Sequence, residues 1–249
     1  MNKTLVALAL LTSTGLAGMS AAQAEEVKFV TNAAYAPFEY VDENNEMQGF
    51  DLDLAKAICE VQKLECSFHN QAFDSLIPSL KFRRYNAAIA AMDITPERAK
   101  QVDFSDIYYE NSAVFVTPEN KFEKLDELQK DTVGVQNGTS HQKYIQDKLA
   151  ANGMMARPYQ SVQDALLDMS NGRINAVFAD TAVVGEWLAK NPGYAVLGGR
   201  ITDDDYFGTG FGIAVTKGNQ ALLEQINQGL SKLKENGTYD TLYQKYFPQ

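Results

Sequence analysis

Residues 66–92 read CSFHNQAFDSLIPSLKFRRYNAAIAAM. The run from Cys66 to Phe68 predicts a short strand. Apolar side chains then recur at helical spacing from Phe73 to Leu80, and residues 87–92 form a small, apolar segment typical of a buried strand. A strand, a helix and a strand in succession predict a parallel sheet covered by helices.

The same alternation extends in both directions. Upstream, residues 27–31 predict a strand and residues 50–61 a helix with one apolar face. Downstream the pattern restarts after residue 112, so the sequence predicts an α/β protein of two lobes. Further strands are expected at 113–116, 132–135, 176–179 and 210–215, and helices at 122–128, 138–151, 162–171, 181–190, 222–236 and 239–247.

The first 24 residues have the features of a secretory signal peptide. A basic start at Lys3 precedes an apolar run from Leu5 to Leu11, and Ala22-Gln23-Ala24 is an A-x-A cleavage site. An uncleaved membrane anchor is the alternative, but the apolar run is short for a bilayer span. We therefore expect export to the periplasm.

Composition narrows the classes of partner. The formal net charge is −10, which argues against binding to nucleic acid or anionic membranes. Cys59 and Cys66 are the two cysteines. In a reducing compartment they would be free core thiols, whereas after export a close pair is expected to form a disulfide.

Catalytic and cofactor-binding patterns are missing from the sequence. The two histidines, His69 and His141, have no partner at metal-ligand spacing. There is no G-x-S-x-G, phosphate loop or dinucleotide-binding glycine pattern. We expect no catalytic residue, metal or cofactor.

Two charged residues favour ligand recognition instead. Arg98 could hold a carboxylate with its guanidinium fork, and Asp180 could accept hydrogen bonds from an ammonium group. The alternatives are a surface arginine and a helix N-cap aspartate. Thr139 and Ser140 follow Gly138 at a helix start that suits an anion, or simply an ordinary N-cap.

Several ordered motifs carry a resemblance to a known family. The chain resembles the periplasmic amino-acid-binding proteins of polar-amino-acid ABC transporters, over essentially all of its mature length. The motifs are AYAPF (34–38), GFDLDL (49–54), FDSLIPSL (73–80), MDITPER (92–98), DFS (103–105), GVQNGTS (134–140), Asp180, GTG (208–210) and NGTY (236–239). MDITPER, HQKYIQD (141–147) and DTAVV (180–184) are most similar to the arginine-specific members.

This resemblance implies a role for each matching position. The ligand α-carboxylate would lie on Arg98 and the backbone N–H groups of Asp93 and Ser140. Asp180 and the Ala91 carbonyl would hold the α-ammonium. Tyr35 and Phe73 would sandwich the side chain, and its far end would meet Asn32, Gln136 and Thr139. The Cys59–Cys66 pair also matches a disulfide of the cationic-amino-acid type.

Departures from the lysine/arginine/ornithine type bear on specificity. Asn32 replaces an aspartate that faces the distal amine, and serines are replaced by Ala90, Ala91 and Asp93. The Asn32 amide can still form hydrogen bonds with a planar guanidinium. A compact lysine ammonium depends more on the negative charge of the replaced aspartate, so its binding should weaken more. We expect arginine to bind better than lysine, with Asp93 near either the α-ammonium or the guanidinium.

The resulting interpretation is a monomeric, two-lobe solute-binding protein with a ligand cleft between its lobes. Residues 25–110 and 210–249 would form lobe I, and 111–209 lobe II. The partners would be L-arginine or a related cationic amino acid and an inner-membrane ABC permease. Two alternatives remain: a dehydratase-like enzyme on this scaffold, with Glu39 as its general acid, or a ligand-sensing module.

Overall fold

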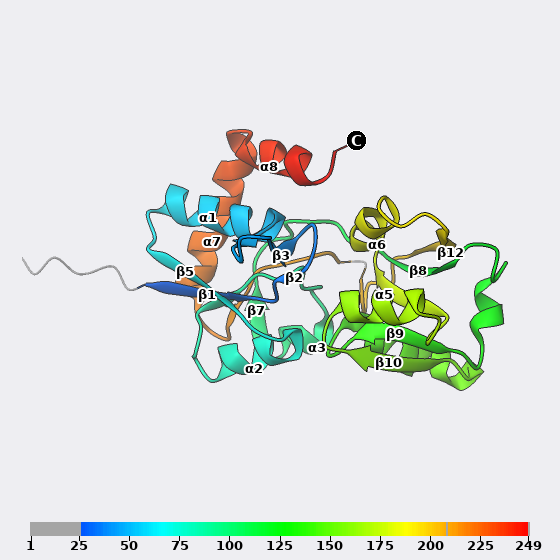
Figure 1. Cartoon of the computed structure of the whole chain (residues 1–249). Coiled ribbons are helices and arrows are strands. Elements are labelled where there is room, and N and C mark those ends of the chain that lie inside the picture. The colour runs from blue at the N-terminus through cyan, green and yellow to red at the C-terminus, as the bar shows by residue number, and fades with distance from the viewer. Residues whose placement is uncertain (1–25, 208, 249) are drawn as a thin grey trace, which may run out of the picture.

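The computed structural model describes residues 26–207 and 209–248. The predicted signal peptide lies outside them. Figure 1 shows two bodies side by side, joined by extended segments, and each body has its own sheet with helices against it. The protein therefore has the two-lobe α/β architecture that the sequence predicts.

The first lobe is built on a sheet of order β5-β1-β6-β13-β7. Strands β5, β1 and β6 are mutually parallel, whereas β13 runs antiparallel to both of its neighbours. A strand from the end of the chain thus completes a sheet begun at its start. The bounds are β1 Val27–Thr31, β5 Cys66–Asn70, β6 Ala87–Ala88, β7 Val102–Phe104 and β13 Ala214–Thr216.

The second lobe repeats this plan with a sheet of order β10-β9-β11-β8-β12. Here β10, β9 and β11 are parallel, and β8 is antiparallel to β11 and β12. The bounds are β8 Ala113–Pro118, β9 Thr132–Gln136, β10 Met155–Tyr159, β11 Ala176–Asp180 and β12 Tyr194–Ile201.

Helices cover both sheets through apolar faces. In the first lobe α1, α7 and α8 pack against one another, and in the second α5 packs on β9 and β11. The Cys59–Cys66 disulfide ties the end of α1 to β5. The helices are α1 Phe50–Gln62, α2 Leu76–Lys81, α3 Pro96–Ala99, α4 Ser140–Tyr144, α5 Val162–Ser170, α6 Thr181–Leu188, α7 Gln220–Glu235 and α8 Thr238–Tyr246.

Short elements complete the fold. A small sheet of β2 Ala34–Tyr35, β3 Glu39–Val41 and β4 Met47–Gln48 lies beside α1. The 3-10 turns are η1 Phe73–Ser75, η2 Leu125–Leu128 and η4 Ala150–Asn152, and η3 Ile145–Leu149 is a π-helix. No helix in the described ranges is long and apolar enough to cross a membrane.

Several local predictions were wrong in extent. The strand expected at 210–215 is limited to β13, Ala214–Thr216. The strand expected at 87–92 ends at Ala88, and Ala91 adopts a φ of 43° that no strand allows. The helix expected at 138–151 begins at Ser140 and changes to π and 3-10 geometry after Tyr144. The helix expected at 122–128 is only the 3-10 turn η2.

Candidate functional site

Strand ends from both lobes meet at one small cavity. Asp93 follows β6 in the first lobe, and Gln136 and Asp180 are the last residues of β9 and β11 in the second. The carboxyl ends of strands are where open α/β sheets place their ligands. The lining residues are Tyr35, Phe73, Ala91, Asp93, Arg98, Gln136, Thr139, His141 and Asp180.

The cavity is narrow because the two lobes are in contact. Its volume of about 10 Å³ is close to that of a single water-sized probe. Ligand pockets usually enclose roughly 300–1,000 Å³. Entry of a ligand the size of an amino acid therefore requires the lobes or their side chains to move apart.

Arg98 lies on α3, where its own N–H donates to the Thr95 N-cap oxygen. Its guanidinium donates to the Asp93 carbonyl at 2.9 Å and, across the cleft, to the Gly138 carbonyl at 3.3 Å. The guanidinium carbon lies 5.4 Å from the centre of the Phe73 ring. Only 8% of the residue is exposed, so the alternative of a surface arginine is wrong.

Among the residues that the structure describes, no carboxylate forms a bidentate pair with the Arg98 guanidinium. The nearest, Asp93 Oδ2, is 4.0 Å from Nη1, which is too long for a hydrogen bond. Burial lowers the pKa of Arg98, and the charges of Asp93 and Asp180 oppose that shift. Because arginine stays charged in proteins, the site holds a buried cation suited to a ligand carboxylate.

Asp180 is enclosed by polar groups on the other side of the cavity. Its Oδ2 accepts the Tyr35 hydroxyl proton at 2.6 Å and its Oδ1 accepts from Asn111 Nδ2 at 2.6 Å. His141 Nε2 lies 3.1 Å from Oδ1, within ion-pair distance but not aligned for a hydrogen bond. Asp180 does occupy the N-cap position of α6, as the alternative expected, but its carboxylate makes no capping bond to that helix.

Asp93 and Asp180 come from different lobes and share one donor. Asn111 Nδ2 donates to Asp93 Oδ1 at 2.7 Å as well as to Asp180 Oδ1. Burial, followed by the negative charge of Asp180, raises the pKa of Asp93 to about 7. The two buried carboxylates therefore make this end of the cavity a place for a cation.

Amide groups close the cavity beyond Tyr35 and Phe73. Gln136 Nε2 donates to Asn32 Oδ1 at 2.7 Å, and Asn32 Nδ2 donates to the Gln71 carbonyl at 2.8 Å. Asn32 thus meets the site through Gln136 and does not line the cavity itself. Within the described part of the chain, this end of the cavity offers neutral amides and no carboxylate.

Thr139 and Ser140 lie at the start of α4. Thr139 is an ordinary N-cap, since its hydroxyl oxygen accepts from the Gln142 N–H while the hydroxyl donates to the Gln136 carbonyl. Ser140 Oγ is buried without a partner among the described residues. Ser140 lines a second, wider space next to the cavity.

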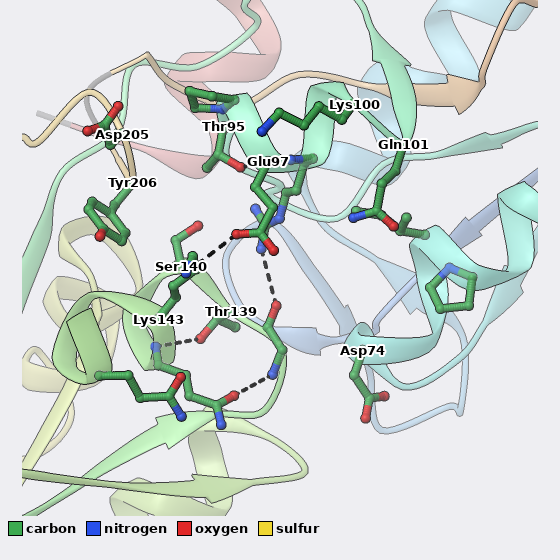
Figure 2. A pocket seen from close by; sticks show the side chains of 17 residues that line it. Asp74, Thr95, Glu97, Lys100, Gln101, Thr139, Ser140, Lys143, Asp205 and Tyr206 are labelled. Carbon is green, nitrogen blue, oxygen red and sulfur yellow. Dashed lines mark hydrogen bonds and ion pairs between the residues drawn. The ribbon is translucent and has the colours of Figure 1, made fainter.

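That space is a groove of about 690 Å³ between α3 and α4, and it shares Arg98 and Thr139 with the cavity. In Figure 2, Thr95 and Glu97 face Ser140 and Lys143 across it. Lys143 Nζ lies 3.5 Å from the Glu97 carboxylate, an ion pair that joins the two lobes at the surface. The groove therefore provides a route between solvent and Arg98.

Two residues of the site were not predicted. Asn111 lies between β7 and β8, where no motif distinguishes it, and it contacts both carboxylates only because two lobes meet there. His141 is considered in the sequence only as a metal ligand and as the first residue of the HQKYIQD motif. Its position in the first turn of α4, two residues after the Thr139 N-cap and in contact with Phe178 of β11, could have indicated a place in the site.

Comparisons with known proteins show the family of the chain. Residues 27–249 match the family model of the bacterial extracellular solute-binding proteins, family 3. The putative ABC transporter arginine-binding protein 2 of Escherichia coli is 55% identical over 229 residues, which cover 92% of this chain and 93% of that protein. The ABC transporter arginine-binding protein 1 of the same organism is 50% identical and covers 99% of this chain and 100% of its own length.

A solved structure extends the similarity to three dimensions. A periplasmic binding protein of Salmonella typhimurium, described for its high arginine specificity, superimposes with a TM-score of 0.86 at 47% identity, covering 90% of this chain and all of that one. Both the family match and these relatives span nearly the whole described chain. The protein belongs to the bacterial extracellular solute-binding proteins, family 3.

Proposed function

We propose that this protein captures L-arginine in the periplasm and delivers it to an inner-membrane ABC permease. The observation that carries the proposal is the placement of Arg98 and Asp180, from opposite lobes, in one cavity. One cation and one carboxylate match the two charged groups of a free α-amino acid. The arginine-binding relatives support the choice of ligand.

Each residue of the site receives a role in this proposal. Arg98 binds the α-carboxylate together with the backbone N–H groups of Asp93 and Ser140. Asp180 binds the α-ammonium with the Ala91 carbonyl. Tyr35 and Phe73 enclose the aliphatic stem and stack on the guanidinium. Asn32, Gln136 and Thr139 define the far end.

Preference for arginine over lysine follows from the neutral far end. The amide oxygens of Asn32 and Gln136 can accept hydrogen bonds from the N–H groups of a guanidinium, whose charge is delocalised over a planar group. A lysine ammonium is more strongly hydrated and would lose its water without gaining a carboxylate there. The two ligands share their α-groups, so discrimination rests on this end.

Ligand capture would proceed by closure of two lobes. We assign residues 25–110 and 210–249 to lobe I and 111–209 to lobe II, because β1, β5, β6, β7 and β13 share one sheet and β8 to β12 the other. A zwitterion that bridges Arg98 and Asp180 binds only the closed form tightly, and so shifts the population toward it. The protein would act as a monomer after removal of residues 1–24.

A dehydratase-like activity is less well supported. The general acid considered for it, Glu39, is buried behind the site and is absent from the residues that line the cavity. Asp180 and Asp93 would also repel a substrate rich in carboxylates. Both observations favour a binding protein without catalytic residues.

Calorimetric titration of the mature protein with arginine, lysine, ornithine, citrulline and histidine tests the proposal. Arginine should bind most tightly, with lysine weaker by at least about tenfold. Asp180→Ala should abolish arginine binding, because the ammonium loses its counter-charge. Equal affinity for lysine would refute the specificity, and absence of binding to every cationic amino acid would refute the function.

A further inference from the structure

Two carboxyl groups are buried behind the cavity without lining it. Glu39 on β3 is 1% exposed and Asp51 at the start of α1 is fully buried. A buried ionised carboxylate is costly unless a cation or several hydrogen bonds compensate it. Neither residue has a cation among the groups that act on its pKa. Both therefore need another explanation.

The two carboxyl groups lie next to each other, since each is among the groups that shift the pKa of the other. Glu39 Oε2 and Asp51 Oδ1 have no hydrogen-bond partner among the described residues. Burial raises the pKa of Glu39 well above its usual value and that of Asp51 to about 7. Both carboxyl groups are therefore protonated more readily than exposed ones.

The remaining oxygen of Asp51 connects the pair to the site. Asp51 Oδ2 accepts the Ala91 N–H at 2.7 Å and the Tyr108 hydroxyl at 2.8 Å. Two other titratable groups act on this pair of carboxyl groups. Tyr108 bonds to Asp51, and the negative charge of Asp180 raises the pKa of Glu39. Of the two hydrogen bonds to Asp51 Oδ2, the one from Ala91 comes from a residue that lines the cavity, whereas Tyr108 does not line it.

Ala91 adopts a conformation that needs support. Its φ of 43° lies in the left-handed region, which is unfavourable for residues with a Cβ atom. The next residues are fixed by bonds from Gly212 N–H to the Met92 carbonyl and from the Ile94 N–H to the Gly210 carbonyl. Asp51 provides the corresponding bond on the other side of Ala91. Together these bonds orient the turn that carries Asp93 into the site.

We propose that Asp51 is a positioning residue that holds the Ala91 turn in its ligand-binding conformation. The inference rests on the proposed function, because the Ala91 carbonyl is there an acceptor for the α-ammonium. Asp51 touches no ligand in this scheme. Its effect on affinity passes through the backbone of Ala91.

Arginine titrations of two Asp51 variants test this role. Asp51→Ala removes the acceptor of the Ala91 N–H and should weaken arginine binding about tenfold. Asp51→Asn keeps an oxygen for Ala91 and offers an N–H to Glu39, so its affinity should stay within about twofold of the wild type. Asp53→Asn, on the same helix but paired with Lys245 at the surface, is the matched control and should leave affinity unchanged.

A spectroscopic readout separates positioning from general stability. The Ala91 amide proton should resonate far downfield in the ligand-free wild type, since it is bonded to a carboxylate. Its shift should titrate with a midpoint near about 7, the pKa of Asp51. Asp51→Asn keeps an oxygen for the Ala91 N–H but cannot ionise, so it should remove this titration.

The outcomes distinguish this inference from the proposed function. Wild-type protein that fails to bind arginine refutes the function, yet the Ala91 amide titration still decides whether the pair acts on the turn. An Ala91 signal that ignores pH overturns the inference even if Asp51→Ala does not fold. Equal affinities of wild type and Asp51→Ala, or no recovery in Asp51→Asn, overturn it as well.

Discussion

Asp93 gives the site a dependence on pH. Its pKa is raised to about 7 by burial and by the charge of Asp180, so about half of the ligand-free molecules carry this proton at neutral pH. A ligand cation between the two carboxylates favours the ionised form and expels the proton. Arginine binding at about pH 7 should therefore release on the order of half a proton, measured by calorimetry in buffers of different ionisation enthalpy.

The sign of the effect follows from the same pKa. Below about 7 the ligand must displace a proton, so affinity should rise roughly tenfold between pH 6 and pH 8. Asp93→Asn should bind with an affinity that is nearly flat over this range. His141→Gln is the control, because His141 also lies beside Asp180. If the pH dependence comes from Asp93, this variant should retain the rise in affinity. If the wild type bound arginine with the same affinity from pH 6 to pH 8, the role of Asp93 in this pH dependence would be contradicted.

Individual residues differ in how well the sequence could predict them. Arg98 and Asp180 lie in motifs at a helix and a strand end, so a place for both at one site could be inferred from the sequence, and both line the cavity. Asn111 could not be found, because its two acceptors come from lobes that meet only in the folded chain. Ala91 lies within an apolar run typical of a strand, so neither its positive φ nor its hydrogen bond to the distant Asp51 could be predicted.

At the level of elements, the loop between β9 and α4 fits closely against η1. Gly138 has a φ of 75°, and a Cβ there would lie 2.8 Å from Asp74 Cβ across the lobes. Gly138→Ala should therefore oppose closure and weaken arginine binding about tenfold. The unfavourable φ should separately lower the stability of the ligand-free protein by about 1 kcal/mol. Isothermal titration and a thermal melt of the ligand-free protein measure the two effects separately.

Gly172 provides the control for this substitution. Its φ of 71° is nearly the same, but a Cβ there would meet nothing within 4 Å. Gly172→Ala should lower stability by about 1 kcal/mol and leave the affinity for arginine unchanged. If both variants lost affinity equally, strain alone would explain the result and the close approach to Asp74 would have no role.

The disulfide stabilises one element without reaching the site. It closes a short loop between α1 and β5, with a sequence separation of 7. Replacing Cys59 and Cys66 by serine should lower the free energy of unfolding by about 2 kcal/mol, mainly because the unfolded chain gains conformational entropy without the cross-link. Urea unfolding measures this loss, and arginine affinity should remain at the wild-type value. A large loss of affinity would indicate that the bond shapes the site.

Secondary structure was easiest to predict where apolar side chains repeat at helical spacing along the whole element. Helices α1, α5, α7 and α8 start and end within two residues of expectation, because each has a continuous apolar face. Strands β10 and β12 were not expected. β10 contains Pro158 and lies at the edge of its sheet, and β12 contains two glycines and a register shift after Leu197. Pairing with neighbours, which no local pattern shows, makes them strands.

For the whole molecule, the balance between open and closed forms should control affinity. The lobes are joined by the Asn32–Gln136 and Tyr35–Asp180 bonds inside the cleft, and by Asn137 Nδ2 donating to Asp74 Oδ2 at 2.6 Å on its surface. Neither Asn137 nor Asp74 lines the cavity. A change at this outer bond therefore alters closure without altering a ligand contact.

Asn137→Ala isolates that contribution. An exposed hydrogen bond to a carboxylate contributes roughly 0.5–1 kcal/mol, so the closed form should become less favourable and arginine affinity should fall about threefold. Small-angle scattering should show a larger mean radius of gyration without ligand and the wild-type value at saturating arginine. Arg173→Ala, which breaks an exposed ion pair within one lobe, should change neither quantity. If Asn137→Ala bound arginine with unchanged affinity, closure would depend on the buried bonds alone.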